Sequence, residues 1–166
     1  MVYDFLKRLM QFIVLGLAQV LIFNGMDILH GAIPLIYVYF IIMFPRNYPK
    51  WAILLWSFVM GVTMDMFTNT PGVAAASLTL IGALQPYLLE LYQPRNANNY
   101  IKTSIHTLGF GKFLTLAYIL IIIYCVVFFT IEAFSFFNFL HWLSCMVGSS
   151  LLTTALILAL ESLRKK

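Results

Sequence analysis

The sequence predicts an all-α integral membrane protein, a single domain with six transmembrane helices. Hydrophobic residues make up 62% of its 166 residues and charged residues only 10%, whereas an ordinary soluble domain is about 25% charged. The apolar residues also form long blocks instead of one face of each helix or strand. Most blocks approach the length of about 20 residues that a helix needs to cross about 30 Å of hydrocarbon. They leave no room for a second, soluble domain.

Six apolar blocks are the predicted spans. The first, about 9–23, begins like a signal peptide, but the small residues Gly16 and Ala18 lie inside the apolar run, so we interpret it as a retained span. The second, about 32–44, covers only about 20 Å as a helix and is either a short span or a re-entrant segment. The others are about 51–67, 73–92, 113–133 and 139–160.

The basic residues favour six spans with both termini in the cytoplasm. Short cytoplasmic loops retain Lys and Arg, whereas short external loops do not. If the second block does not cross, the best orientation leaves Lys7 and Arg8 outside and the other eight basic residues inside. With six spans, all ten fall on the cytoplasmic side: Lys7, Arg8, Arg46, Lys50, Arg95, Lys102, Lys112, Arg164, Lys165 and Lys166. Their scatter beside apolar blocks argues against a nucleic-acid surface.

One connection, 93–111, is long enough for structure of its own. Between Tyr100 and Leu108 apolar residues recur on one helical face, and Gly109 is a stop signal. We predict an interfacial helix over about 99–108. It is either a connector at the membrane surface or a docking surface for a cytoplasmic partner.

The stretch "GVTMDMFTNTPGV" places Asp65 near the end of the third apolar block. A charge in hydrocarbon costs about 2.5 to 3.5 kcal/mol on lenient scales, and this end of a helix carries the negative end of its dipole. Thr70 is expected to be the N-cap of the fourth helix, with Pro71 as its first residue and Gly72 allowing close approach. We expect Asp65 to face the exposed amides of that helix start.

Three roles remain open for Asp65. It braces the tight external corner with Thr70, Pro71 and Gly72, it contacts a partner helix, or it belongs to a proton or ion relay. A relay normally needs a second titratable group at depth, and we identify none in the sequence. Partner contacts are expected on exposed small or apolar helix faces and at the two external corners, residues 24–31 and 68–72.

Small residues gather in the third and fourth spans. Such residues let membrane helices approach closely, so we predict that this hairpin is the packing centre, chiefly through Gly61, Ala75, Ala76 and Gly82. Farther along the fourth span, Gln85 and Pro86 predict a helix kink or, alternatively, a polar spot that faces a substrate.

Other polar and aromatic residues have structural interpretations. Gln19 and Asn24 are expected to donate hydrogen bonds between helices, and Glu90 is expected to pair with Arg95 at the interface. Aromatic residues toward the span ends predict an interfacial belt: Tyr37, Tyr39, Trp51, Trp56, Tyr87, Tyr92 and Trp142.

We find no pattern of a catalytic or metal site in the sequence. His30, His106 and His141 are dispersed, and Cys125 and Cys145 lie within apolar blocks, where a free thiol behaves as a small hydrophobe. Metal-ligand spacing, a glycine-rich phosphate loop, a nucleophile elbow and paired carboxylates are all missing from the sequence. The sequence therefore predicts a protein that is not an enzyme and uses no cofactor.

These residues together resemble the rod shape-determining protein MreD family. The likeness consists of the pattern G-x-x-x-D-x-F from Gly61 to Phe67, the turn with Pro71 and Gly72, and a fourth helix ending in "QPYLLEL". The stretches "RLMQFIVLGLAQVLIFNG" and "IPLIYVYFIIMFPRNYPKW" are similar to members from Bacteroidetes-type bacteria. The resemblance covers residues 9–92, and beyond Asn96 it is one of hydropathy only.

The resemblance implies a non-enzymatic scaffold of the cell-elongation complex, which synthesises peptidoglycan and determines rod shape, in the bacterial inner membrane. Its implied partners are membrane-anchored MreC and, through it, RodA, the elongation transpeptidase and, indirectly, MreB filaments. The implied fold is that of the six-helix substrate-binding subunits of energy-coupling-factor importers. A vitamin-importer subunit is therefore the alternative function, although the first span lacks an A-x-x-x-A docking pattern and the external loops are short for covering a ligand.

Overall fold

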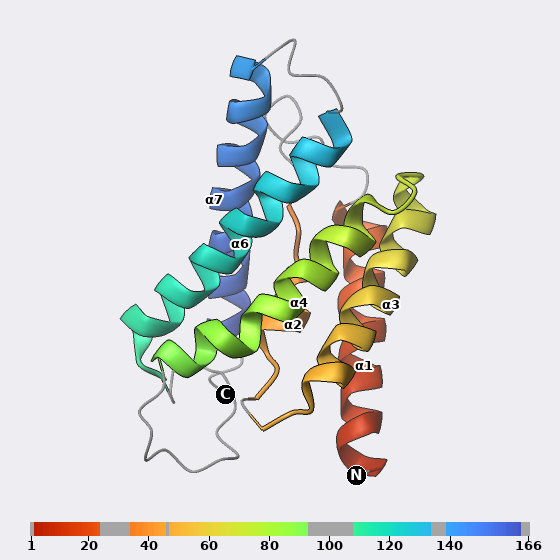
Figure 1. Ribbon diagram of the computed structural model, residues 1–166, viewed down its shortest axis with the longest axis vertical. Coiled ribbons are helices and arrows are strands. Elements are labelled where there is room, and N and C mark those ends of the chain that lie inside the picture. The colour runs from red at the N-terminus through yellow and green to blue at the C-terminus, as the bar shows by residue number, and fades with distance from the viewer. Residues whose placement is uncertain (1, 24–33, 46, 93–107, 134–138, 164–166) are drawn as a thin grey trace.

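The computed structural model describes residues 2–23, 34–45, 47–92, 108–133 and 139–163. Within these ranges the chain forms helices and contains no strand (Figure 1). The elements are α1 (Val2–Ala18), the π-helix η1 (Gln19–Phe23), α2 (Val38–Ile42), α3 (Lys50–Thr68), α4 (Val73–Tyr92), α6 (Phe110–Ala133) and α7 (Phe139–Leu163).

Four helices of the described part are long and apolar enough to cross a membrane. They are Lys50–Thr68, Val73–Tyr92, Phe110–Glu132 and Trp142–Leu163. All four match predicted spans, and α4 has the predicted bounds. These helices support the prediction of an all-α membrane protein.

The first span was predicted at about residues 9–23, and the structure differs from this prediction at both ends. Helix α1 begins already at Val2 and, after Ala18, continues as the five-residue π-helix η1. The predicted interfacial helix over 99–108 lies, apart from Leu108, outside the described residues.

Helix α4 is the centre of the bundle. It packs against α3 on one side and α6 on the other, while α7 packs against α6 and α1 against α3. In Figure 1, α1, α3 and α6 run upward, and residues 34–44, α4 and α7 run downward. The start of α1 and the end of α7 therefore lie toward the same end of the molecule.

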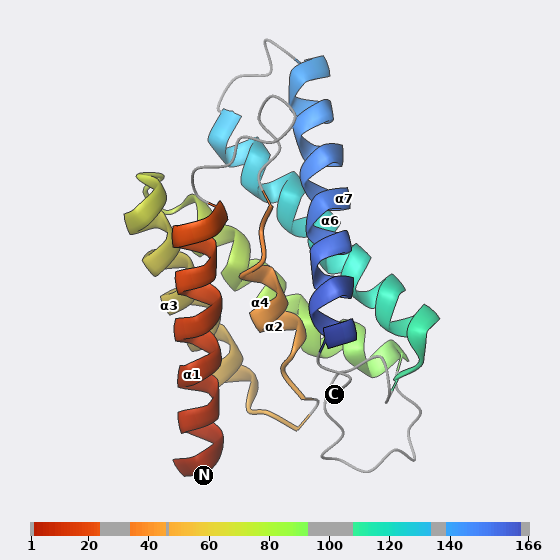
Figure 2. The same ribbon diagram turned by 180° about the vertical axis from the view of Figure 1, so that it is seen from behind.

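Residues 34–44, here called the buried segment, replace the second predicted span. Only the five residues of α2 are helical, yet every residue from 34 to 44 is buried. Pro34 and Pro45 bracket the segment, and proline both removes a backbone donor and disfavours helix in the residue before it. Figure 2 shows the segment passing between α1 and α7 in front of α4. The structure therefore contradicts a continuous helical span at this position, but not the re-entrant segment that the sequence left as the alternative.

Aromatic side chains of the buried segment form the middle of the core. The Phe40 ring makes edge-to-face contacts with Phe12, Phe44 and Trp56. Tyr37 and Tyr39 are 3% and 5% exposed, so their assignment to an interfacial belt is wrong. Helices cover both faces of this segment, and alternate residues therefore have no solvent or lipid side to occupy.

Candidate functional site at the α3–α4 hairpin

The connection between α3 and α4 is a tight turn, here called the hairpin corner (residues 65–73). Helix α3 ends at Thr68, and its C-cap residue Asn69 has a left-handed conformation (φ 58°, ψ 34°) that Asn tolerates better than most residues. The backbone N–H groups of Asn69 and Thr70 both donate to the carbonyl oxygen of Asp65. Gly72 has φ 84°, and α4 begins at Val73.

The Asp65 carboxylate accepts hydrogen bonds from the start of α4. Its Oδ1 lies 2.8 Å from the backbone N of Ala74, and its Oδ2 lies 2.9 Å from the backbone N of Ala75. These are the second and third residues of α4, whose N–H groups an N-cap side chain normally satisfies. Asp65 therefore caps a helix from the preceding helix, and the capping position itself is occupied by Gly72, which has no side chain.

The prediction that Thr70 is the N-cap of α4 is wrong, because α4 begins at Val73. Thr70 and Pro71 both belong to the turn, because the positive φ of Gly72 prevents the helix from starting before Val73. The Thr70 hydroxyl instead donates to Oδ1 of Asp65 (3.1 Å) and pairs with the Thr68 hydroxyl (2.7 Å). Thr70 thus supports the carboxylate and leaves the capping to it.

Two helix dipoles act on Asp65 with opposite sign. The carboxylate lies at the negative end of α3 and at the positive end of α4. The contact with α4 is direct, through two charge-assisted backbone hydrogen bonds, which are stronger than neutral ones. These two bonds thus offset the unfavourable dipole of α3 at a side chain that is only 7% exposed.

Two glycines allow α3 and α4 to approach each other closely, Gly61 at the backbone of α4 and Gly82 at the side chain of Ser57. A Cβ atom on Gly61 would lie 2.7 Å from the Ala75 nitrogen and 2.8 Å from the Ala74 oxygen. A Cβ atom on Gly82 would lie 2.9 Å from the Ser57 Cβ. Such separations are too short for real Cβ contacts, so neither position accepts a larger residue without moving a helix.

Ala76, the remaining predicted packing residue, does not lie between α3 and α4. It is exposed and lines a groove of about 600 Å³ along the outside of the hairpin, here called the outer groove. The α4 residues of this groove recur every three or four positions and therefore share one helix face. The lining is Leu54 and Phe58 from α3, Gly72 from the turn, and Ala75, Ala76, Thr79, Leu80 and Ala83 from α4.

Gln85 and Pro86 lie within α4, which continues to Tyr92. The Gln85 side chain is fully buried, and its Nε2 donates to the carbonyl oxygen of Phe44 (3.0 Å). Its Oε1 has no hydrogen-bond partner in the described part of the chain. The amide is thus directed to the backbone of the buried segment.

Gln19 and Thr153 serve the other end of the buried segment. Gln19 donates to the Pro34 carbonyl (2.8 Å) and accepts from the Ile36 N–H (3.0 Å), and Thr153 Oγ1 accepts from the Leu35 N–H (3.0 Å). Non-helical backbone at membrane depth is tolerated only where protein groups satisfy it. The sequence indicated Gln19 as an interhelical donor, but its partner is this non-helical backbone.

Sequence reasoning missed Arg8 and Glu161. Arg8 donates to the Met43 carbonyl (3.4 Å), and its guanidinium lies 4.6 Å from the centre of the Phe44 ring. Glu161 is 3% exposed and accepts a hydrogen bond from the Tyr39 hydroxyl. A second buried carboxylate therefore exists, contrary to the sequence-based statement, although α3 and α7 end toward opposite ends of the bundle (Figure 1).

Several residues that the sequence analysis singled out are not part of the contacts described above. Cys125 and Cys145 are buried, and the described residues contain no group of three or more His, Cys, Asp or Glu that could bind a metal ion. Glu90 is exposed near the end of α4. The predictions for Asn24, His30, Arg95, His106 and the external corner 24–31 concern residues outside the described ranges, and the side chain of His141 is not described either.

Comparisons of the chain with models of protein families, with curated proteins and with solved structures found no match. The resemblance to the MreD family therefore depends on the residues quoted above.

Proposed function

We propose that this protein is a non-enzymatic scaffold of the bacterial cell-elongation complex, with the role of MreD in the inner membrane. The observation that supports this proposal best is the outer groove, a surface of small residues on a hairpin fixed by Asp65. In this proposal the buried segment completes six crossings, and both termini are cytoplasmic.

The outer groove has the composition of a helix-binding surface. Lipid is as apolar as a helix side chain, so association in the membrane depends on close packing and is favoured by small residues. From Gly72 to Ala83 the groove follows α4 for about 16 Å. Phe58 and Leu80 form its larger lining side chains, against which a helix can pack.

The hairpin is also preorganised for binding. The backbone contact at Gly61 and the hydrogen bonds of Asp65 fix α3 relative to α4. A surface that does not have to be ordered on association loses less free energy when it binds. The partner that fits is the membrane helix of a single-pass protein, and the resemblance implies MreC. RodA, the elongation transpeptidase and MreB would join through it.

Co-purification tests this proposal. An affinity-tagged form of the chain is expected to retain MreC, and Ala76→Trp, which fills the outer groove, is expected to lower the retained amount about tenfold, equivalent to about 1.4 kcal/mol. Ala155→Trp is the matched control, because Ala155 is an exposed residue of α7 away from the groove. Thermal unfolding in detergent shows whether both variants are folded.

Two results would contradict the scaffold. One is equal retention of MreC by the folded Ala76→Trp and Ala155→Trp variants. The other is purification of the chain with a bound vitamin-sized molecule and without a single-pass partner, which would instead support the importer subunit.

A further inference from the structure

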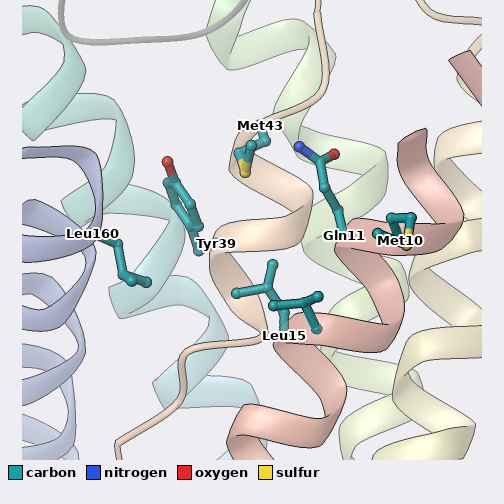
Figure 3. A pocket seen from close by; sticks show the side chains of 7 residues that line it. Met10, Gln11, Leu15, Tyr39, Met43 and Leu160 are labelled. Atoms are coloured by element: carbon teal, nitrogen blue, oxygen red, sulfur yellow. The ribbon is translucent and has the colours of Figure 1, made fainter. Parts of the chain in front are cut away.

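A groove of about 360 Å³ lies between α1, the buried segment and α7 (Figure 3). Its lining is almost entirely apolar, and its polar side chains already form hydrogen bonds: Gln11 accepts one from Arg8, and Tyr39 donates one to Glu161. Lipid is as apolar as this lining, so the groove does not select a particular ligand. The other face of the buried segment, toward α4, contacts a polar atom for which the described residues supply no partner.

This atom is the side-chain oxygen of Gln85. Gln85 is 0% exposed, and its Nε2 donates to the carbonyl oxygen of Phe44 (3.0 Å). Because a carbonyl only accepts, the amide nitrogen must face Phe44, and the amide oxygen points elsewhere. Oε1 has no hydrogen-bond partner among the described residues. An unsatisfied polar atom in an apolar interior is costly, and a bound water or ion is a common explanation of such an atom.

The residue that follows Gln85 creates a second acceptor. Pro86 lies inside α4, and proline has no N–H group to donate to the carbonyl oxygen four residues earlier, which is that of Gly82. Gly82 is buried as well. The Ser57 hydroxyl, which lies against Gly82, donates to the carbonyl oxygen of Ile53 instead (2.7 Å). This turn of α4 therefore contains two buried acceptors for which the described residues supply no donor.

Helix geometry brings the two acceptors close together. A long side chain in a helix points back toward the N-terminus and lies over the residues three and four positions earlier, which places the Gln85 amide over Gly82. The ring of a helical proline also pushes the carbonyl of residue i−4 away, and such a gap in the backbone ladder is a position where water inserts. In membrane helices, ordered water is one of the groups that satisfy a carbonyl freed by proline.

We propose that a buried water molecule binds in this turn of α4 and donates one hydrogen bond to Gln85 Oε1 and the other to the Gly82 carbonyl oxygen. The two donors of water match the two acceptors. Both acceptors are neutral, so a cation would bring an uncompensated charge into a buried site. Ordering the water offsets part of the free energy of its hydrogen bonds, and the site therefore adds little to the stability of the fold. The proposal does not depend on the scaffold function.

Nuclear magnetic resonance tests this site without any variant. In detergent, a water molecule held beside Gln85 for longer than the protein takes to tumble gives a nuclear Overhauser peak between water and the side-chain amide protons of Gln85. Gln19 is the internal control, because it is also buried and its amide nitrogen and oxygen both bond to backbone groups of the protein. We expect the peak at Gln85 and none at Gln19.

Pro86→Ala tests the second acceptor. Alanine restores an N–H group that donates to the Gly82 carbonyl, so the water keeps only one acceptor, and the peak at Gln85 should be lost. Ser77→Ala is the matched control, because Ser77 is another buried α4 residue and its hydroxyl bonds within α4; this variant should retain the peak. The backbone amide spectrum shows whether each variant is folded.

Three results would overturn the buried water. They are the lack of a peak at Gln85 in the unmodified protein, an equal peak at Gln19, and a folded Pro86→Ala variant that keeps the peak. If Pro86→Ala does not fold, the comparison of Gln85 with Gln19 still decides between presence and absence of the water.

Discussion

Asp65 shows how one carboxylate can belong to two helices. It is part of the last turns of α3 by sequence, but its side chain satisfies the Ala74 and Ala75 N–H groups of α4. A local N-cap constrains only the residues beside it, whereas Asp65 fixes the end of one helix to the start of the next. Stability and geometry of the hairpin therefore depend on the same two hydrogen bonds.

Replacing Asp65 should destabilise the protein in a graded order. Asp65→Ala leaves two buried N–H groups without an acceptor, each at a cost of about 1 to 3 kcal/mol, and Asp65→Asn keeps one acceptor oxygen. The midpoint of thermal unfolding in detergent should fall for both variants and more for Ala. Thr63→Ala is the control, since Thr63 bonds only within α3. If Asp65→Ala left both stability and partner co-purification intact, Asp65 would neither brace the hairpin corner nor contact a partner helix.

The glycines of the hairpin should differ in how they respond to substitution. Gly61→Val forces the backbones of α3 and α4 apart and should cost about 2 kcal/mol or more. Gly72 faces open space, so Gly72→Ala carries only the penalty of its positive φ, about 1 to 2 kcal/mol. Gly111→Ala has open space, lies within helix α6 and should be neutral or stabilising. A comparison of unfolding midpoints checks this order, and equal effects at Gly61 and Gly111 would contradict it.

At this scale the sequence indicated the partners of Asp65 but not the cap itself. Thr70 has the right residue type for an N-cap, and Pro71 the right type for a first helical residue. The backbone conformation of Gly72 decides where α4 starts, and a glycine is compatible with several conformations. The left-handed one becomes fixed only when α3 and α4 are packed together.

The buried segment is the element that departs most from its prediction. It is apolar enough for a span, but Pro34 and Pro45 limit its helix to five residues. Its backbone is satisfied by Gln19 and Thr153 at one end and by Arg8 and Gln85 at the other. Side chains from helices α4 and α7, together with α1 and η1, thus substitute for the missing hydrogen bonds.

Substitutions of Gln19 and Gln85 should differ in how much they destabilise the protein. Gln19→Leu removes a donor and an acceptor that both serve buried backbone groups, at a cost of about 1 to 3 kcal/mol for each group left unsatisfied. Gln85→Leu loses one hydrogen bond but also removes Oε1, which has no partner among the described residues, so its effect should be much smaller. Thermal unfolding of both variants provides the measurement, and a larger loss for Gln85→Leu would contradict the assignment.

Hydropathy predicted the long helices because it responds to length and apolar content. The bounds of α4 agree with the prediction, and α3, α6 and α7 differ only at their ends. Hydropathy cannot distinguish a helix surrounded by lipid from a segment surrounded by protein, since both are apolar. Because of this ambiguity, Tyr37 and Tyr39 were predicted to lie at the membrane interface, whereas both side chains are buried in the protein.

At the scale of the whole molecule, the direction of the chain alternates through α1, the buried segment, α3, α4, α6 and α7 (Figure 1). If the buried segment counts as a crossing, six crossings place both termini on one side. All ten basic residues then share that side, as short cytoplasmic loops require.

Reporter fusions test this topology. A fluorescent protein that folds only in the cytoplasm should be fluorescent on either terminus, and alkaline phosphatase, which is active only outside, should be inactive on both. A fusion at the hairpin corner, for example after Thr70, should give the opposite pair of results. Activity of the phosphatase at one terminus alone would mean an odd number of crossings.

The sequence by itself determined the membrane class, the long helices and the close approach of α3 to α4, because apolar length and small residues act locally along the chain. Only the tertiary structure decided that the second block is a buried segment, that Asp65 caps α4 from another helix, and that Arg8 and Glu161 form hydrogen bonds with the buried segment. These features depend on hydrogen bonds between residues far apart in the chain. A polar side chain in an apolar block shows that a partner is needed, but the partner is selected by the packing of the whole bundle.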